Sequence, residues 1–477
     1  MKQLSVTKIF LGISVLMLPA LAEAATVSKD AKPPIPPDLF FEYPYVADDE
    51  NAIINWRRAA QILVPLEEKE REIIAYCWTP GAKTPSNEYR NQLETWLRRN
   101  KEALELFEAS LKKPKAQWPE RNAQNVQKEL IGFPQLIRAR LLEADLLAEK
   151  GQFNQAQESL LQSLRLVEFG LDGDGALLHY LVCGNTRTLV QNGILRFATH
   201  RELPASALED LLKNLPSIDN ETNLYAKTLR VEFLTAYAGL NLKKLAEDWS
   251  KVPADGLAMI GYPEEFRRPF KVFLDPSLIL QHPKPIDVRA GIEGTIRNYR
   301  IYRTNSFSRW ADRDQTVEKE TAKIQAKLKR DIKLLMKLVE NEPLPLTKQA
   351  VERARVAYLK IENPIGRIFH CSTNLITRNA TKVFRYRTER EAIRATLAIL
   401  IFERRKGQLP ATLSDLVEEK ILHSLPNDPF ADAPLFYSRE NRIVWSVGEN
   451  GVNDGGDKDQ EFHWLGEDAV WQIPEIK

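Results

Sequence analysis

Apolar residues recur every three or four positions along residues 48–250, a spacing that places them on one face of a helix. Asp48 or Asp49 is expected to cap the first helix, and Gly151 is expected to follow the end of the third. The pattern predicts an irregular array of antiparallel helix pairs in this domain. The expected helices cover residues 53–63, 86–111, 125–150, 154–169, 176–199, 204–215 and 220–249.

Proline, glycine and aromatic residues interrupt the helical pattern over residues 251–310, which predicts a long connection. A further helical segment is expected over 311–384, and the last helix is expected to end at Lys406. The turn at 151–156 looks like the inter-helix turn of tetratricopeptide repeats. No second copy follows at the period of about 34 residues, so a true repeat protein stays an alternative.

The spacing of apolar residues changes after Gly407, which is expected to end the last helix in the left-handed conformation. Thr412 is expected to cap a short helix. Residues 435–438 and 442–447 predict a β-hairpin, and a third strand is expected near 461–465. The predicted fold is therefore mainly α, with a small α+β domain over 385–477.

The most specific motifs lie in this last domain. They are the run Gly407-Gln-Leu-Pro-Ala-Thr-Leu-Ser-Asp-Leu-Val417, then Leu425-Pro-Asn-Asp-Pro-Phe430, Pro434-Leu-Phe-Tyr-Ser438, Ile443-Val-Trp-Ser-Val-Gly448 and the acidic loop 449–459. Their order resembles the C-terminal globular part of the major pseudopilin of type II secretion systems. The whole layout is similar to a group of uncharacterised secreted bacterial proteins. The resemblance implies a domain that assembles and binds calcium, not one that catalyses. The apolar start typical of pseudopilins is absent from this chain.

The N-terminus has the pattern of a secretory signal peptide over residues 1–24. Lys2 and Lys8 precede the apolar run 9–18. Ala22 and Ala24 are small residues at the positions that suit cleavage before Ala25. A proline-rich linker is expected over 25–47. The chain is therefore expected to be exported, to the periplasm or beyond the cell, and to meet the membrane only through the signal peptide.

Charge is balanced over the whole chain but not along it. The 67 Lys and Arg residues nearly match the 65 Asp and Glu residues, so no global field indicates a nucleic-acid partner. Residues 297–406 hold 26 basic and 12 acidic residues, whereas residues 426–477 hold 4 basic and 11 acidic ones. This asymmetry favours a basic helical body packed against an acidic end domain; a basic face for anionic lipid or cell-wall polymer is the alternative.

The acidic loop is the candidate metal site. Calcium takes six to eight oxygen ligands from carboxylates, amides and backbone carbonyls, and glycines let the backbone turn its carbonyls inward. The resemblance implies that Asp454, Asp457 and Asp459 supply carboxylates for Ca2+, with Asn450 as a further ligand. A solvated turn without an ion is the alternative, since Asn, Asp and Gly also favour turns.

Other chemistry has little support in the sequence. No nucleophile elbow, zinc-protease motif or glycine-rich phosphate loop is present. Cys77, Cys183 and Cys371 are too widely spaced for a redox or zinc motif, and whether two of them pair is left open. We therefore expect a non-catalytic scaffold or interaction protein of the bacterial cell envelope, with a protein partner. The alternatives are an accessory factor of type II secretion or pilus-like assembly, and an envelope hydrolase with its site in 251–310.

Overall fold

The computed structural model describes residues 46–65, 87–118, 123–216, 224–231, 347–361, 380–457, 464 and 466–476, with scattered positions between 322 and 338. This part of the chain is mainly helical and ends in a small antiparallel sheet, which confirms the predicted fold class at that level. Its longer helices are α2 (Ala52–Ile62), α4 (Asn87–Arg99), α5 (Lys101–Ala109), α6 (Ala123–Glu149), α7 (Phe153–Asp172), α8 (Leu177–Phe197), α9 (Ala205–Lys213), α17 (Lys348–Tyr358) and α20 (Ala380–Lys406).

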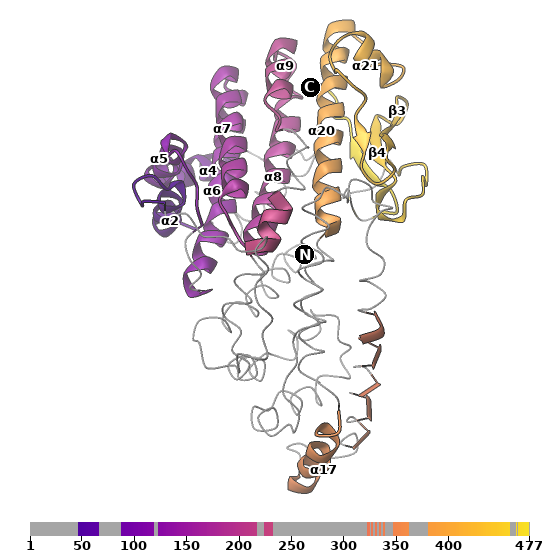
Figure 1. Ribbon diagram of the computed structural model, residues 1–477. Helices are drawn as coiled ribbons and strands as arrows, with labels where there is room; N and C mark the ends of the chain where they lie inside the picture. The colour runs from indigo at the N-terminus through magenta and orange to yellow at the C-terminus, as the bar shows by residue number, and fades with distance from the viewer. Residues whose placement is uncertain are drawn as a thin grey trace.

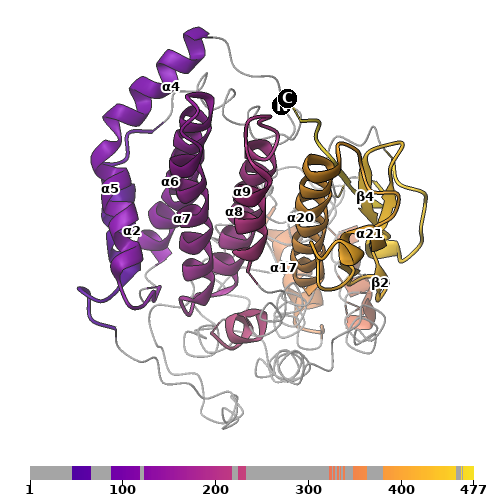
Figure 2. The same cartoon turned by 90° about the horizontal axis from the view of Figure 1, so that it is seen from above.

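The helices stand in a row that runs from α5 and α2 through α6, α7, α8 and α9 to α20, with the sheet beyond α20 (Figures 1 and 2). Helix α6 packs against α2, α7 and α8, and α20 packs against α8 and α9. One continuous cluster of buried apolar side chains extends from α2 to the sheet. Helix α20 thus has the helical body, defined as residues 46–231, on one side and the end domain, residues 407–476, on the other.

The predicted helix over 86–111 is broken at Asn100, so that part of the prediction is wrong. The Asn100 side chain is 1% exposed, and its Oδ1 accepts a hydrogen bond from the Val64 backbone N–H at 2.7 Å. Its amide group donates to the carbonyls of Val64 and Trp96. These bonds satisfy backbone groups just after α2, and they require Asn100 to leave the helical conformation between α4 and α5.

The first cap also differs from the prediction. Asn51, not Asp48 or Asp49, caps α2, because its Oδ1 accepts a hydrogen bond from the Ile53 N–H at 3.1 Å. The same oxygen accepts one from the Gln117 N–H, so the cap also ties the start of α2 to a distant strand-like segment. Gly151, with φ of 74°, lies just after α6 as predicted, and Gly407, with φ of 72°, adopts the predicted left-handed conformation.

Helix α20 lies unusually close to α8. A Cβ atom at Gly184 would overlap the ring of Tyr386, so this approach needs glycine. The Tyr386 hydroxyl lies 3.1 Å from Oδ1 of Asn185. At the other end of the seam, which is the contact between α8 and α20, the Arg404 guanidinium donates to three carbonyls just beyond α8. These carbonyls belong to Ala198, His200 and Arg201. Side-chain cations near a helix C-terminus satisfy its last carbonyls in this way.

The end domain begins after Gly407 with the short helix α21 (Ser414–Glu418) and a small two-stranded ladder, β1 (Asn427–Asp428) with β2 (Ala433–Pro434). The predicted hairpin is confirmed as β3 (Phe436–Ser438) and β4 (Ile443–Ser446). The third strand, β5 (Ala469–Gln472), pairs antiparallel with β4 and lies after the predicted stretch. Residues 461–463 and 465 of that stretch are outside the described residues.

The expected signal peptide, almost all of the linker and the whole 251–310 connection also fall outside the residues that the structure describes. Within the described ranges, no helix combines the length and the apolar character needed to cross a membrane.

Candidate functional site

The acidic loop folds back over the outer face of the sheet. After β4 the chain makes one 3-10 turn (Gly448–Asn450) and then runs across Trp445 and Ile443. Gly456, with φ of 67°, lies against both of these side chains, and a Cβ there would meet them at 3.0–3.1 Å. The Trp445 indole N–H donates to Oδ1 of Asn453 at 3.0 Å. The sheet therefore fixes the position of the loop.

Two predicted ligands lie together in this loop. The Asn450 amide N–H donates to Asp454 Oδ2 at 2.9 Å, and Asn450 Oδ1 accepts from the Val452 N–H at 2.9 Å. Asp457 follows in the same loop with an exposed side chain. Asp459, the fourth predicted ligand, is outside the described residues.

Asp468 is a candidate ligand that the sequence analysis missed. It immediately precedes β5, and the residue is 4% exposed. Its Oδ2 accepts hydrogen bonds from the backbone N–H groups of Asp454 at 3.0 Å and Gly456 at 2.8 Å. Its Oδ1 is buried and has no hydrogen-bond partner among the described residues. A buried carboxylate oxygen is costly to leave without a partner, so this atom is suited to a cation or another donor.

The donor chemistry of the loop suits a hard cation. Carboxylate and amide oxygens from Asn450, Asp454 and Asp468 match the ligands that calcium prefers, and thiolate and imidazole groups that would favour zinc are absent from this set. The described residues contain no group of three or more His, Cys, Asp or Glu side chains already arranged to hold a metal ion. Asp454 would have to exchange its bond with Asn450 for an ion, whereas Asp468 Oδ1 needs no such exchange.

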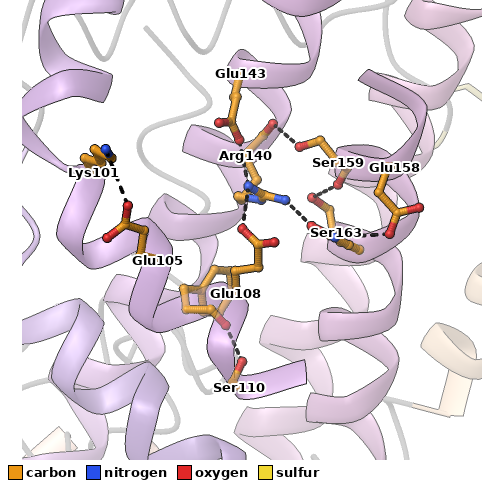
Figure 3. Close-up of polar contacts among 11 residues, drawn as sticks. Lys101, Glu105, Glu108, Ser110, Arg140, Glu143, Glu158, Ser159 and Ser163 are labelled. Carbon is orange, nitrogen blue, oxygen red and sulfur yellow. Dashed lines mark hydrogen bonds and ion pairs between the residues drawn. The ribbon is translucent and has the colours of Figure 1, made fainter. Parts of the chain in front are cut away.

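A second polar cluster lies in the helical body, between α5, α6 and α7 (Figure 3). Arg140 of α6, whose side chain is 7% exposed, lies 2.7 Å from Glu143 and 3.4 Å from Glu108 of α5, and it donates to Gln162 of α7. Burial raises the pKa of Glu143, while Arg140 opposes and Glu108 adds to this shift. The cluster connects α5, α6 and α7, so its arrangement indicates a contact that joins three helices.

Cys183 of α8 is a free, buried thiol. Burial raises its pKa well above the ordinary value, with an opposing effect from Arg187, so the reactive thiolate form is disfavoured. Cys77 and Cys371 lie outside the described residues. Cys183 therefore acts as a small core residue, which agrees with its position in the apolar cluster.

Comparisons with known protein families, curated proteins and solved structures find no match to this chain.

Proposed function

We propose that this protein is a non-catalytic, exported scaffold or interaction protein of the bacterial cell envelope, whose end domain is stabilised by calcium. The carboxylate of Asp468 carries the calcium part of this proposal. It is buried, it is already bonded to two backbone N–H groups of the acidic loop, and one of its oxygens has no partner among the described residues. An ion between this oxygen and the loop carboxylates would hold the loop against the sheet.

The scaffold part rests on how firmly the end domain is joined to the helical body. Arg404 bonds three carbonyls beyond α8, and Arg405 of α20 lies 2.7 Å from Glu209 of α9. Arg442, directly before β4, is paired with Glu403 of α20 through both of its terminal nitrogens, at 2.9 and 3.0 Å. A bidentate pair of this kind fixes orientation as well as distance. These contacts support a role in which the end domain holds the acidic loop in a fixed orientation on the helical body.

Calcium titration of the full-length protein after chelator treatment tests the proposal. We expect calorimetric binding with a stoichiometry near one and a rise in melting temperature. At a free calcium concentration about one hundred times Kd, binding should raise the free energy of unfolding by about 2.7 kcal/mol. Both effects should be lost in Asp454→Ala/Asp457→Ala and in Asp468→Asn. The full chain is used because α20 belongs to the core of both regions.

The matched control is Glu440→Ala, which removes a carboxylate from the exposed turn between β3 and β4. This variant should bind calcium as the parent does. A parent that binds no calcium, or loop variants that respond as the parent does, would contradict the calcium site. Turnover of an envelope substrate by the purified protein would instead contradict the non-catalytic scaffold, and loss of secreted proteins on gene deletion would favour the accessory secretion factor.

A further inference from the structure

A groove lies beside α17, and the described helical positions of residues 322–338 line its other side. Its volume is about 980 Å³, and its apolar lining includes Leu334, Leu338, Val356 and Ile361. Leu334 is 64% exposed and Val356 is 44% exposed, so Leu334 is the most exposed large apolar side chain among the described residues. Exposed apolar side chains in a groove of this size indicate a binding surface. We call it the α17 groove.

The charged residues around the α17 groove are mostly cations. Those that line it are Lys327, Asp331, Glu352, Arg353 and Lys360. Glu352 accepts a hydrogen bond from Nε of Arg355 at 2.7 Å, so a further cation offsets this carboxylate. The described residues at 322–338 and 347–361 include nine Lys and Arg but only two Asp and Glu, and eight of the nine basic residues are exposed. This part of the molecule therefore attracts anions over an area wider than the groove.

The distribution of these cations favours an extended anionic surface over a single acidic peptide. Lys323, Arg330 and Lys337 are exposed and do not line the groove. They are seven positions apart, so they lie on one side of their helical stretch. A peptide held in the groove would leave these cations unused, whereas a planar anionic surface would contact them as well. Cations beside exposed apolar side chains are typical of protein surfaces that lie in the interface of an anionic membrane.

The place of α17 in the molecule agrees with such a partner. Helix α17 lies at the far end of the molecule from the sheet (Figure 1). Residues 426–477, which include the sheet, hold 11 acidic and 4 basic residues. An anionic surface would therefore attract the end that carries α17 and repel the end domain. The charge asymmetry of the chain gives the molecule one preferred orientation on that surface.

We propose that the α17 groove docks the protein on the surface of a bilayer that contains anionic phospholipid. Lys327, Arg353 and Lys360 bind the lipid phosphate groups, and Leu334 and Val356 enter the apolar part of the interface. This goes beyond the proposed function, which assigns no role to α17.

Sedimentation of the full-length protein with lipid vesicles, in the presence of chelator, tests the docking. The vesicles consist of phosphatidylcholine with or without phosphatidylglycerol. We expect binding that requires phosphatidylglycerol and weakens as salt is raised. Lys327→Gln/Lys360→Gln should lower the partition coefficient about tenfold or more, because each cation near an anionic surface contributes to binding. Leu334→Gln/Val356→Gln should lower it severalfold through the loss of apolar insertion.

The matched control is Lys101→Gln/Lys112→Gln, which removes two exposed cations from the helical body and should bind as the parent does. All variants keep the N-terminal apolar run 9–18, so differences between them report on the groove. Melting temperatures close to that of the parent show that the variants are folded.

Three results would overturn the proposal. The first is a parent that does not prefer vesicles with phosphatidylglycerol, and the second is an equal loss of binding in the control and in Lys327→Gln/Lys360→Gln. The third is unchanged binding by Leu334→Gln/Val356→Gln together with displacement of the vesicles by soluble polyglutamate, which would indicate a face for acidic polymers. The chelator separates this test from the calcium site, so a parent that binds no calcium would leave the expected results unchanged.

Discussion

Two buried aspartates in the end domain have opposite surroundings. Asp428, in β1, is fully buried, and both of its oxygens are bonded. Its Oδ1 accepts from the Phe430 N–H at 3.0 Å and the Ser446 hydroxyl at 2.8 Å, and its Oδ2 accepts from the Val447 N–H at 2.9 Å. Burial raises the pKa of Asp428, and these hydrogen bonds oppose the shift. Both oxygens of this carboxylate therefore have hydrogen-bond donors from the protein and need no ligand.

Asp468 uses only one of its two oxygens. Both of its hydrogen bonds, from Asp454 and Gly456, go to Oδ2, and Oδ1 has no partner among the described residues. The difference teaches that burial of a carboxylate does not identify a site; the number of its satisfied oxygens is more informative. Asp428 closes a turn, whereas Asp468 leaves an acceptor that an ion could use.

The largest expected effect is on the free energy of unfolding, measured without calcium, when the carboxylate of Asp428 or of Asp468 is removed. Asp428→Ala leaves three buried donors without an acceptor and should lower the free energy of unfolding by about 3 kcal/mol or more. Asp468→Asn retains an acceptor for the loop N–H groups and removes a buried charge, so it should change this free energy by less than about 1 kcal/mol. Urea unfolding in the presence of chelator measures both changes in free energy. Equal losses of stability in the two variants would contradict the difference inferred between the two aspartates.

Asp145 of α6 extends the comparison to a partly buried carboxylate that has a cationic partner. Its Oδ2 lies 3.0 Å from Nε of Arg196. Burial raises the pKa of Asp145 to about 6, although Arg196 opposes the shift, and Glu149 adds to it. The native state therefore keeps the proton to a higher pH than the unfolded chain, whose Asp pKa is about 3.9.

The sign of the pH effect follows from that difference. The stability contributed by protonated Asp145 is present below pH about 4 and is lost as pH rises through about 6. Compared with Asp145→Asn, the parent should lose roughly 2 to 3 kcal/mol of unfolding free energy between pH 4 and pH 7. Denaturant unfolding of both proteins over this range measures the difference. Parallel profiles would show that Asp145 is ionised in the fold throughout.

The smallest expected effect concerns two glycines of the acidic loop with the same backbone conformation. Gly451 and Gly456 have φ of 70° and 67°, but a Cβ at Gly451 would meet open space, whereas one at Gly456 would press on Trp445 and Ile443. Gly451→Ala should cost about 1 kcal/mol from the left-handed conformation alone, and Gly456→Ala about 2 kcal/mol. Thermal unfolding monitored by tryptophan fluorescence compares them. A Gly451→Ala variant as unstable as Gly456→Ala would place the loop away from the sheet.

Helices could be predicted well because their signal is local. The ends at Gly151 and Gly407 follow from residues within the same turn. The break at Asn100 could not be predicted, because it depends on Val64, which lies 36 positions earlier in the chain. The same distinction explains the third strand. Its pairing with β4 is a contact over a long loop, so the short run Ala469–Gln472 does not by itself identify the partner of the hairpin.

The candidate site shows the same limit. The resemblance implies Asn450 and Asp454 as ligands within one short loop, and these two side chains do contact each other. Asp468 lies fourteen positions beyond Asp454, and only the pairing of β5 with β4 brings it under the loop. The available signal was an aspartate directly before a short apolar run. Whether this aspartate lies near the acidic loop depends on the register of β5 against β4, which places Ala469 opposite Ser446 just before the loop begins.

The close contact between Gly184 and Tyr386 has a consequence for how such a gene can change. Any larger residue at 184 would collide with the tyrosine ring, and a smaller residue at 386 would leave a hole in the seam. A recombination event that replaced α20 together with the end domain would therefore keep this contact only if the incoming helix carried a ring at the matching position. Positions 184 and 386 are therefore expected to change together, although more than two hundred codons separate them.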